Sequence, residues 1–199
     1  YHDVQFITIL PEEEKEQWCW MRWLPHAKLQ ELNVRGFVYN QRTRDQVLNS
    51  LNQILKLRRS QKEEASHKES TLFHPHYVVL VTDEKLILDH VIMEFFTEDP
   101  TELGCSLVFV EDVMSSLSEN IQTVINIKDR NTGQLVMEEG VLKETDFHLD
   151  HFPADYDKER IARTLAPLNH LQNLKSSIPD SVTFMEMYGA ETFEDLQVS

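Results

Sequence analysis

Apolar residues form four stretches of strand length within the first 110 residues of the chain. They cover residues 4–10, 37–39, 77–81 and 105–110, and they are rich in β-branched and aromatic side chains. Residues 78–81 and 107–110 are apolar without interruption, which is typical of strands that are buried on both faces of a sheet. We therefore expect these four stretches to form the core sheet.

Two segments between these strands have the pattern of helices. The capping-box sequence from Thr43 to Gln46 predicts the start of a helix that runs to about residue 59 with one apolar face. Residues 61–70 are charged or small and predict an exposed loop, whereas residues 84–96 predict a second helix that is well buried. Strands that alternate with helices predict an α/β fold, with a mostly parallel sheet and helices on both faces.

The second half of the chain changes character. Apolar and polar residues alternate over 121–128, and residues 129–133 form a turn signal before 134–138, so we expect an antiparallel hairpin that extends the sheet at its edge. Asp157 is placed to cap a helix that Pro167 would kink. A second capping box begins at Thr183, and Gly189 is expected to end that short helix.

The strand at residues 77–81 ends in the adjacent carboxylates Asp83 and Glu84. A buried strand that ends in two acids has the form of a Walker B element, in which Asp83 would hold Mg²⁺ and the catalytic Glu84 would polarise the attacking water. Alternatively, any buried strand can end in a polar turn, and Asp83 would then simply be the N-cap of the helix that follows it. The five glycines are dispersed and no Gly-x-x-x-x-Gly-Lys sequence occurs, so a phosphate-binding loop is missing from this sequence.

Other residues with possible chemistry give weaker signals. Trp18, Trp20 and Trp23 lie within six residues, and they either pack on the core or form a surface for a partner. The histidine pairs at 74 and 76 and at 148 and 151 lack further ligands at metal-binding spacing, so we interpret them as surface or capping residues. The two cysteines, at 19 and 105, are expected to be reduced thiols.

Charge excludes some partners. The 199 residues contain 34 acidic and 19 basic side chains, which gives a formal net charge of −15. Such a chain does not offer the basic face that a nucleic-acid backbone requires, and it is repelled by anionic lipid. No apolar run approaches the roughly 20 residues that are needed to span a bilayer, so we expect a soluble, mostly monomeric domain.

Several segments together resemble a known family. They are residues 1–4, 22–26, 36–40, 90–96 and 178–184, in addition to the strand that leads into Asp83 and Glu84. These segments are similar to FtsK/SpoIIIE-type motor domains, and in particular to the EssC/EccC family of membrane-bound ATPases of type VII secretion systems. The resemblance covers essentially the whole chain.

The resemblance implies a three-layer RecA-like P-loop NTPase fold, truncated at its N-terminus. Residues 1–175 would form a degenerate FtsK/SpoIIIE-like ATPase domain, and residues 176–199 a linker with short helices towards the next ATPase domain. Asp83 and Glu84 align with the family's Walker B pair, which would bind Mg-ATP in the parent protein, although this segment alone is not expected to hold a nucleotide tightly.

The resemblance also implies a place in the cell and a set of partners. The domain would lie at the cytoplasmic face of the membrane as part of a membrane protein. Its partners would be the neighbouring transmembrane and ATPase domains, the other subunits of a homo-hexamer, and small helical-hairpin proteins that the parent exports. We expect a catalytically weak or inactive domain that couples the membrane part to the motor domains. The alternative is a working Mg-ATP hydrolase whose P-loop lies upstream of Tyr1.

Overall fold

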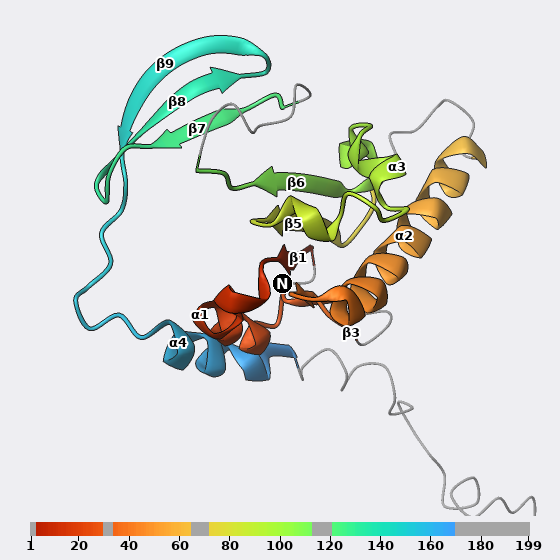
Figure 1. Ribbon diagram of the computed structural model, residues 1–199, viewed down its shortest axis with the longest axis horizontal. Coiled ribbons are helices and arrows are strands. Elements are labelled where there is room, and N and C mark those ends of the chain that lie inside the picture. Colours follow the sequence, from red (N-terminus) through yellow and green to blue (C-terminus); the bar gives the residue numbers. More distant parts are fainter. Residues whose placement is uncertain (1–2, 30–33, 65–71, 113–120, 170–199) are drawn as a thin grey trace, which may run out of the picture.

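The core of the molecule is a four-stranded parallel sheet with the strand order β4-β1-β5-β6 (Figure 1). The computed structural model describes residues 3–29, 34–64, 72–112 and 121–169. The strands are β1 (Val4–Ile9), β4 (Phe37–Val38), β5 (His76–Val81) and β6 (Cys105–Phe109). All four lie where the apolar stretches predict them, and all neighbouring pairs are parallel, so this part of the α/β prediction is confirmed.

Strand β5 lies inside the sheet, between β1 and β6. Its register runs from Val4 opposite His76 to Ile9 opposite Val81, and on its other side Val81 pairs with Phe109. The backbone N–H of Thr82 still donates to the carbonyl of Ile9 at 2.8 Å, so the pairing with β1 continues one residue past β5. The strand that carries Asp83 and Glu84 is therefore central, as the Walker B interpretation requires.

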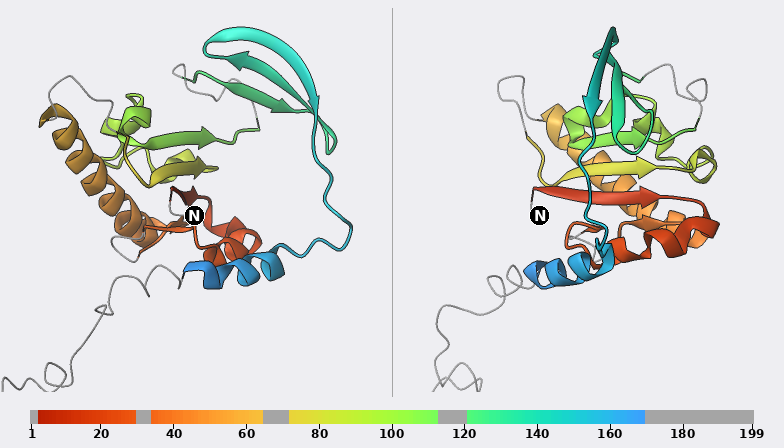
Figure 2. Two further views of the ribbon diagram at one scale, coloured as in Figure 1. Left: turned by 180° about the vertical axis from the view of Figure 1, so that it is seen from behind. Right: turned by 90° about the vertical axis from the view of Figure 1, so that its left-hand side faces the viewer.

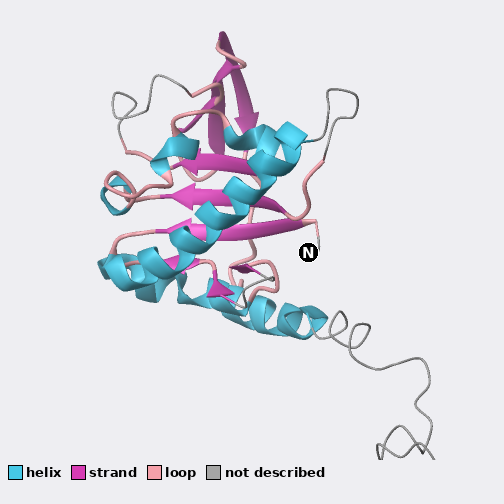
Figure 3. Cartoon of the chain, turned by 90° about the vertical axis from the view of Figure 1, so that its right-hand side faces the viewer, coloured by secondary structure: helices cyan, strands magenta, loops and turns pink. Residues whose placement is uncertain are grey.

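One face of the sheet is covered by α2 (Gln41–Glu64) and α3 (Met93–Phe96). Figure 3 shows α2 crossing the strands diagonally on this side. Side chains at alternate strand positions pack against the two helices because successive residues of a strand point to opposite faces. This buried core includes Ile7, Ile9, Tyr77, Val79, Val81 and Cys105 from the strands, Leu48, Leu51 and Leu55 from α2, and Ile92, Phe95 and Phe96 from α3.

Helix α2 begins two residues before the predicted capping box and is longer than expected. Its cap pairs Asn40 with Thr43: the N–H of Thr43 donates to Asn40 Oδ1 at 3.0 Å, and the N–H of Asn40 donates to Thr43 Oγ1 at 3.1 Å. Thr43 therefore occupies the third helical position of a reciprocal cap rather than the N-cap itself. The helix continues to Glu64, so the first part of the predicted loop at 61–70 is helical, and the rest lies outside the described residues.

On the opposite face, the described residues cover the sheet at β1 with short helices, so the prediction of helices on both faces is correct only in part. There, Thr8 Oγ1 contacts Met21 Sδ at 3.6 Å, and the Phe6 and His26 rings lie 5.7 Å apart. Met21 belongs to η2 (Cys19–Trp23), which follows η1 (Glu12–Glu14) and α1 (Lys15–Trp18). The chain then forms a small two-stranded sheet, β2 (Lys28–Leu29) with β3 (Val34–Arg35), before it reaches β4.

The predicted helix over residues 84–96 is wrong in its extent. The segment forms a single 3₁₀ turn, η4 (Glu84–Leu86), then turns, and only then the four-residue helix α3. His90 is buried, and its Nδ1 accepts the backbone N–H of Ile92 at 3.1 Å, so a side chain replaces the helical bond that this amide would make. Another 3₁₀ turn, η5 (Pro100–Leu103), leads into β6.

The antiparallel part is a separate sheet of three strands rather than a hairpin on the edge of the core sheet. It contains β7 (Val124–Ile127), β8 (Thr132–Glu138) and β9 (Val141–His148), in that spatial order. Sequence analysis missed β9. Strands β8 and β9 are joined by Glu139 and Gly140, both with positive φ, as in a two-residue type I′ hairpin turn.

The chain returns from β9 to the lower part of the molecule through residues 149–157, which we call the strap (Figure 1). Asp157 then caps α4 (Lys158–Leu165) as predicted, accepting the N–H of Arg160 at 2.9 Å. Pro167 lies in the 3₁₀ turn η7 (Ala166–Asn169) after α4 rather than kinking the helix. The predicted capping box at Thr183, Gly189 and the linker at 176–199 lie outside the described residues.

Candidate functional site

Asp83 and Glu84 lie at the carboxyl end of the central strand β5. Asp83 is half-buried, and its Oδ1 accepts the backbone N–H of Lys85 at 3.1 Å. Asp83 is therefore the N-cap of η4. Capping is the structural role that the sequence offered as the alternative to metal binding. One oxygen of this carboxylate is occupied by the cap, and Mg²⁺ commonly takes only one or two protein carboxylates together with phosphate oxygens.

Glu84 lies next to a second acid that follows the neighbouring strand. Burial raises the pKa of the half-buried Glu84 carboxyl, and the negative charge of Glu111 raises that pKa further. Glu111 follows β6 in the same way that Asp83 and Glu84 follow β5. Sequence analysis did not select Glu111, although the pattern of an apolar strand followed by the acids Glu111 and Asp112 was present.

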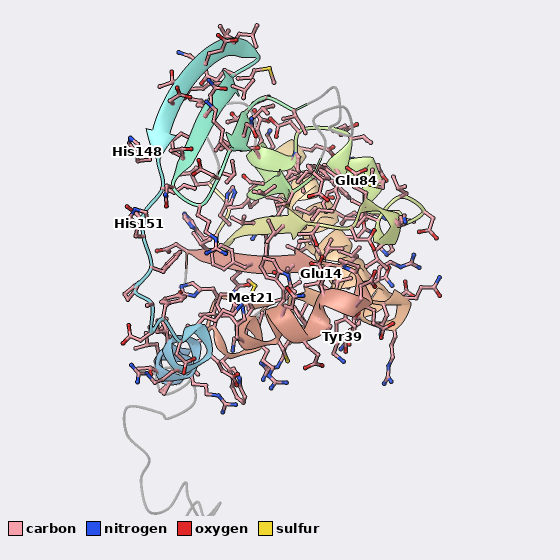
Figure 4. All side chains as sticks on the ribbon, turned by 60° about the vertical axis from the view of Figure 1, so that its left-hand side comes forward. Glu14, Met21, Tyr39, Glu84, His148 and His151 are labelled. Atoms are coloured by element: carbon pink, nitrogen blue, oxygen red, sulfur yellow. The ribbon has the colours of Figure 1, made fainter. Side chains whose placement is uncertain are left out.

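The loop after β1 adds more acids to the same edge of the sheet. Pro11 is followed by the three glutamates of η1, and Figure 4 shows that Glu14 and Glu84 lie towards the same end of the strands. Glu14 accepts a hydrogen bond from Trp18 Nε1 at 3.3 Å. The ammonium of the adjacent Lys15 lies 4.5 Å from the centre of the Tyr39 ring, in a cation–π contact.

This edge is also where the sheet topology favours ligands. The chain leaves β1 towards β4 and leaves β5 in the opposite direction, towards β6, so the strand order reverses between β1 and β5, which is where open α/β sheets bind ligands. Oxygen-rich side chains at this edge suit a hard cation and repel an unaccompanied phosphate. Among the described residues, no group of three or more His, Cys, Asp and Glu side chains is arranged to hold a metal ion.

The tryptophan surface is partly covered by the chain itself. Helix α4 packs on η2, burying Ala162 completely and placing the guanidinium of Arg163 4.3 Å from the centre of the Trp23 ring. Lys158 Nζ lies 5.6 Å from the Trp20 ring. Between η2 and α4 lies an open pocket of about 600 Å³, lined in part by Cys19 and Trp20. The interpretation that these tryptophans pack within their own domain is the one that this geometry favours.

The described histidines and cysteines have local roles. His76 Nε2 lies 2.9 Å from Ser106 Oγ, and burial is the main cause that lowers its pKa. His148 and His151 lie along β9 and the strap, away from Glu84 (Figure 4). Both cysteines are free, and burial raises the pKa of Cys105 to about 12.

No described helix is both long enough and apolar enough to cross a membrane.

Fold and site together define the class: an α/β domain with a parallel sheet, an acidic carboxyl edge and a separate antiparallel sheet. Sequence comparison gives the family. The chain is 46% identical over 199 residues to the type VII secretion system protein EssC of Staphylococcus aureus strain MSSA476. It is 36% identical over 198 residues to the ESX secretion system protein EccC of Geobacillus thermodenitrificans. The chain belongs to the EssC/EccC family of type VII secretion proteins.

The match covers all of this chain but only a part of its relatives. The chain spans 13% of the length of each of these curated proteins. No protein-family model matches the sequence, and no solved structure matches it.

Proposed function

We propose that this chain is an ATPase-like domain of a type VII secretion motor, with a RecA-like fold and with little or no ATPase activity of its own. It couples the membrane part of the protein to the ATPase domains at the cytoplasmic face of the membrane. Its partners in this proposal are those neighbouring domains, the other subunits of a homo-hexamer and, through the parent protein, small helical-hairpin substrates. The names of its relatives support the place in secretion.

The observation that carries the proposal is the charge of the carboxyl edge. Glu84 and Glu111 are close enough for the charge of one to raise the pKa of the other, and the three glutamates of η1 follow the adjacent strand. Lys15, the basic residue that directly follows them, lies over the Tyr39 ring. Phosphoryl transfer depends on cations and backbone N–H groups that neutralise the phosphates, so carboxylates alone should catalyse it poorly.

A second candidate is a Mg-ATP hydrolase that is completed by a phosphate-binding loop from polypeptide before Tyr1. The position of Asp83 and Glu84 on a central strand favours this candidate, because a Walker B pair requires a buried strand that is paired on both sides. In that case Asp83 would hold the metal and Glu84 would polarise water. The difference between the two candidates is whether Mg-ATP stabilises the folded domain through Asp83.

Two aspartate caps allow a matched experiment. Asp83 caps η4 at the carboxyl edge, and Asp99 caps η5 before β6, accepting the N–H of Thr101 at 3.0 Å. Asp83→Ala and Asp99→Ala should each cost about 1 kcal/mol, which is the usual cost of losing a cap. Melting temperatures and ATP turnover are measured for both variants and for the unmodified chain, each extended at its N-terminus by the natural sequence, with and without millimolar Mg²⁺ and ATP.

The expected result is that Mg-ATP leaves all three melting temperatures unchanged. A ligand that binds the folded state raises the melting temperature. If Mg-ATP binds at Asp83, it should raise the melting temperatures of the unmodified chain and of Asp99→Ala but not that of Asp83→Ala. That pattern, together with ATP turnover that Asp83→Ala abolishes, would refute the inactive domain in favour of the second candidate.

A further inference from the structure

The sheet of β7, β8 and β9 stands apart from the core sheet. In both views of Figure 2 it lies beyond β6, and none of the described helices lies against either of its faces. Ile125 and Ile127 of β7 are each 56% exposed, and β9 contains no buried residue. In the part of the chain that the structure describes, this sheet therefore has no covering layer.

The two faces of this sheet differ in chemistry. On one face the paired positions of the three strands carry no charge; they are Ile125, Leu135 and Thr145 in one row, and Ile127, Gly133 and Phe147 in the next. We call these six residues the apolar face. The other face carries polar residues from all three strands, namely Asn126, Gln134 and Asp146.

Phe147 makes the apolar face continuous. A Cβ atom built on Gly133 would collide with the ring of Phe147, so the ring lies directly over this glycine of the neighbouring strand. The ring covers the position where β8 has no side chain beside Ile127. The face is therefore apolar across all three strands.

An apolar face that is open to water is unusual for such a sheet. Antiparallel sheets commonly bury their apolar face against other structure and turn their polar face to solvent. Exposed apolar patches that are rimmed by polar residues mark interaction sites. The apolar face is therefore suited to a covering layer from outside the described residues.

Charge around the apolar face determines which surface can cover it. Residues 121–150 hold six acidic and three basic side chains. Lys128 and Lys143 already form ion pairs with acids of the same sheet. Glu139 and Glu144 are exposed and have no ion-pair partner among the described residues. The excess of negative charge favours a positively charged partner.

The same charge argues against this polypeptide as its own cover. Two copies that meet through the apolar face would each bring a formal charge of −15, and their repulsion opposes association. Residues 170–199 hold five acidic side chains and one basic side chain, so they do not complement the face either. Anionic lipid is repelled in the same way.

We propose that the apolar face is the docking site for an amphipathic helix of a partner protein, whose apolar stripe is flanked by lysine or arginine. Neighbouring strands lie roughly 4.8 Å apart, so three strands span roughly 10 Å, which is the diameter of one helix. Strand β8 has seven residues and spans roughly 23 Å, the length of a helix of about 15 residues. This site includes neither Asp83 nor Glu84, so it is compatible with either candidate function.

The edges of the sheet are less suited to a partner than its face. The pairing of β8 with β9 is irregular between Leu135 and Met137, and Glu144 of β9 has a φ of +51°. Bulges and charged residues on an edge strand oppose the addition of another strand. The other edge strand, β7, has only four residues. A helix on the apolar face needs neither edge.

The experiment measures the binding of a model helix by fluorescence anisotropy. The probe is a fluorescein-labelled peptide of about 15 residues with blocked ends, in which leucines at helical spacing form the stripe and lysines fill the other positions. The chain is extended at its N-terminus by the natural sequence. The test variant combines Ile125→Thr with Ile127→Thr, and the control is Asn126→Thr on the polar face of the same strand. Threonine is β-branched, so both variants keep the strand propensity.

The unmodified chain should bind the lysine peptide. The double variant should bind it about tenfold more weakly because apolar contact is lost, and Asn126→Thr should change the affinity by less than about twofold. Glu139→Gln combined with Glu144→Gln should weaken binding about threefold, and a peptide with glutamate in place of lysine should not bind. If far-UV circular dichroism shows that the double threonine variant is unfolded, Ile127→Thr alone replaces it, with an expected weakening of about threefold.

Other outcomes would overturn the proposal. Absence of binding, or equal binding by the double threonine variant and the unmodified chain, would show that the apolar face does not hold a basic helix. Tighter peptide binding after deletion of residues 170–199 would assign the face to that segment. A dimer in light scattering that the double threonine variant loses would assign it to a second copy of the chain.

Discussion

Replacing Arg58 by methionine should strongly destabilise the domain. Arg58 lies on α2 and is only 5% exposed. Its guanidinium donates to the carbonyl of Leu103 at 2.9 Å and to that of Pro75 at 2.8 Å, and it lies 5.0 Å from the centre of the Tyr77 ring. This one side chain therefore ties α2 to the turns that precede both β5 and β6.

The size of the effect follows from the groups that lose a partner. Each carbonyl that is left buried without a donor costs about 1–3 kcal/mol. The cation–π contact with Tyr77 contributes about 1 kcal/mol more, and the aliphatic methionine keeps most of the packing. We expect a loss of about 3–5 kcal/mol, which is a large share of the roughly 5–15 kcal/mol that stabilises a typical domain.

The adjacent residue gives a matched control. Arg59 is half-buried and forms surface ion pairs with Glu94 and Glu98, both at 2.9 Å. Such pairs contribute about 0–1 kcal/mol, and the contact of the Arg59 guanidinium with the Phe95 ring at 4.2 Å contributes about 1 kcal/mol, so Arg59→Met should cost clearly less than Arg58→Met. Both variants are compared by urea unfolding, followed by far-UV circular dichroism. If Arg58→Met costs no more than Arg59→Met, the buried hydrogen bonds of Arg58 do not hold the domain together.

Two further predictions concern backbone strain and pH. Gly104 has a φ of +72°, and a Cβ there would lie 3.0 Å from the carbonyl oxygen of Phe73, whereas Gly140 has a φ of +76° and open space around it. Gly104→Ala should therefore lower the urea midpoint clearly more than Gly140→Ala, and equal effects would contradict the close approach. The pKa of the Glu84 carboxyl is higher in the folded state than in the unfolded state, so folding favours its protonated form. The contribution of Glu84 to the free energy of unfolding is therefore present at low pH and is lost as pH rises through the folded-state pKa. Glu84→Gln should raise the melting temperature at pH 7 relative to the unmodified chain by more than it does at pH 4, and the same increase at both pH values would refute this.

The strands were predictable because their signal is local. Each core strand is a short apolar run, and burial on both faces demands such a run whatever the surrounding structure is. The same reasoning placed Asp83 and Glu84 at the end of a central strand. Their proximity to Glu111 was not predictable with the same certainty, because it depends on which strands are neighbours, and that is decided by packing over the whole sheet.

The predictions from sequence were wrong in two kinds of segment. In one, side chains compete with the backbone for hydrogen bonds; in the other, the residues do not contribute to a buried core. Residues 84–96 have the apolar content of a helix, but His90 accepts the N–H of Ile92 and Arg44 pairs with Asp89 at 2.8 Å, which fixes turns instead. Strand β9 was missed because nearly all of its residues are exposed, so it lacks the alternation that reveals a half-buried strand. The turn at Glu139 and Gly140 was the available signal.

The attachment of α4 determines how the domain responds to a pulling force. Tension that enters through the polypeptide after Asn169 reaches α4 before it reaches any strand, and α4 is held by one buried alanine, Ala162, and by contacts with Trp20 and Trp23. The parallel strands are held by backbone hydrogen bonds along their whole length. Under such a force we therefore expect α4 to detach first, which lengthens the chain by the residues of the strap while the core sheet stays folded.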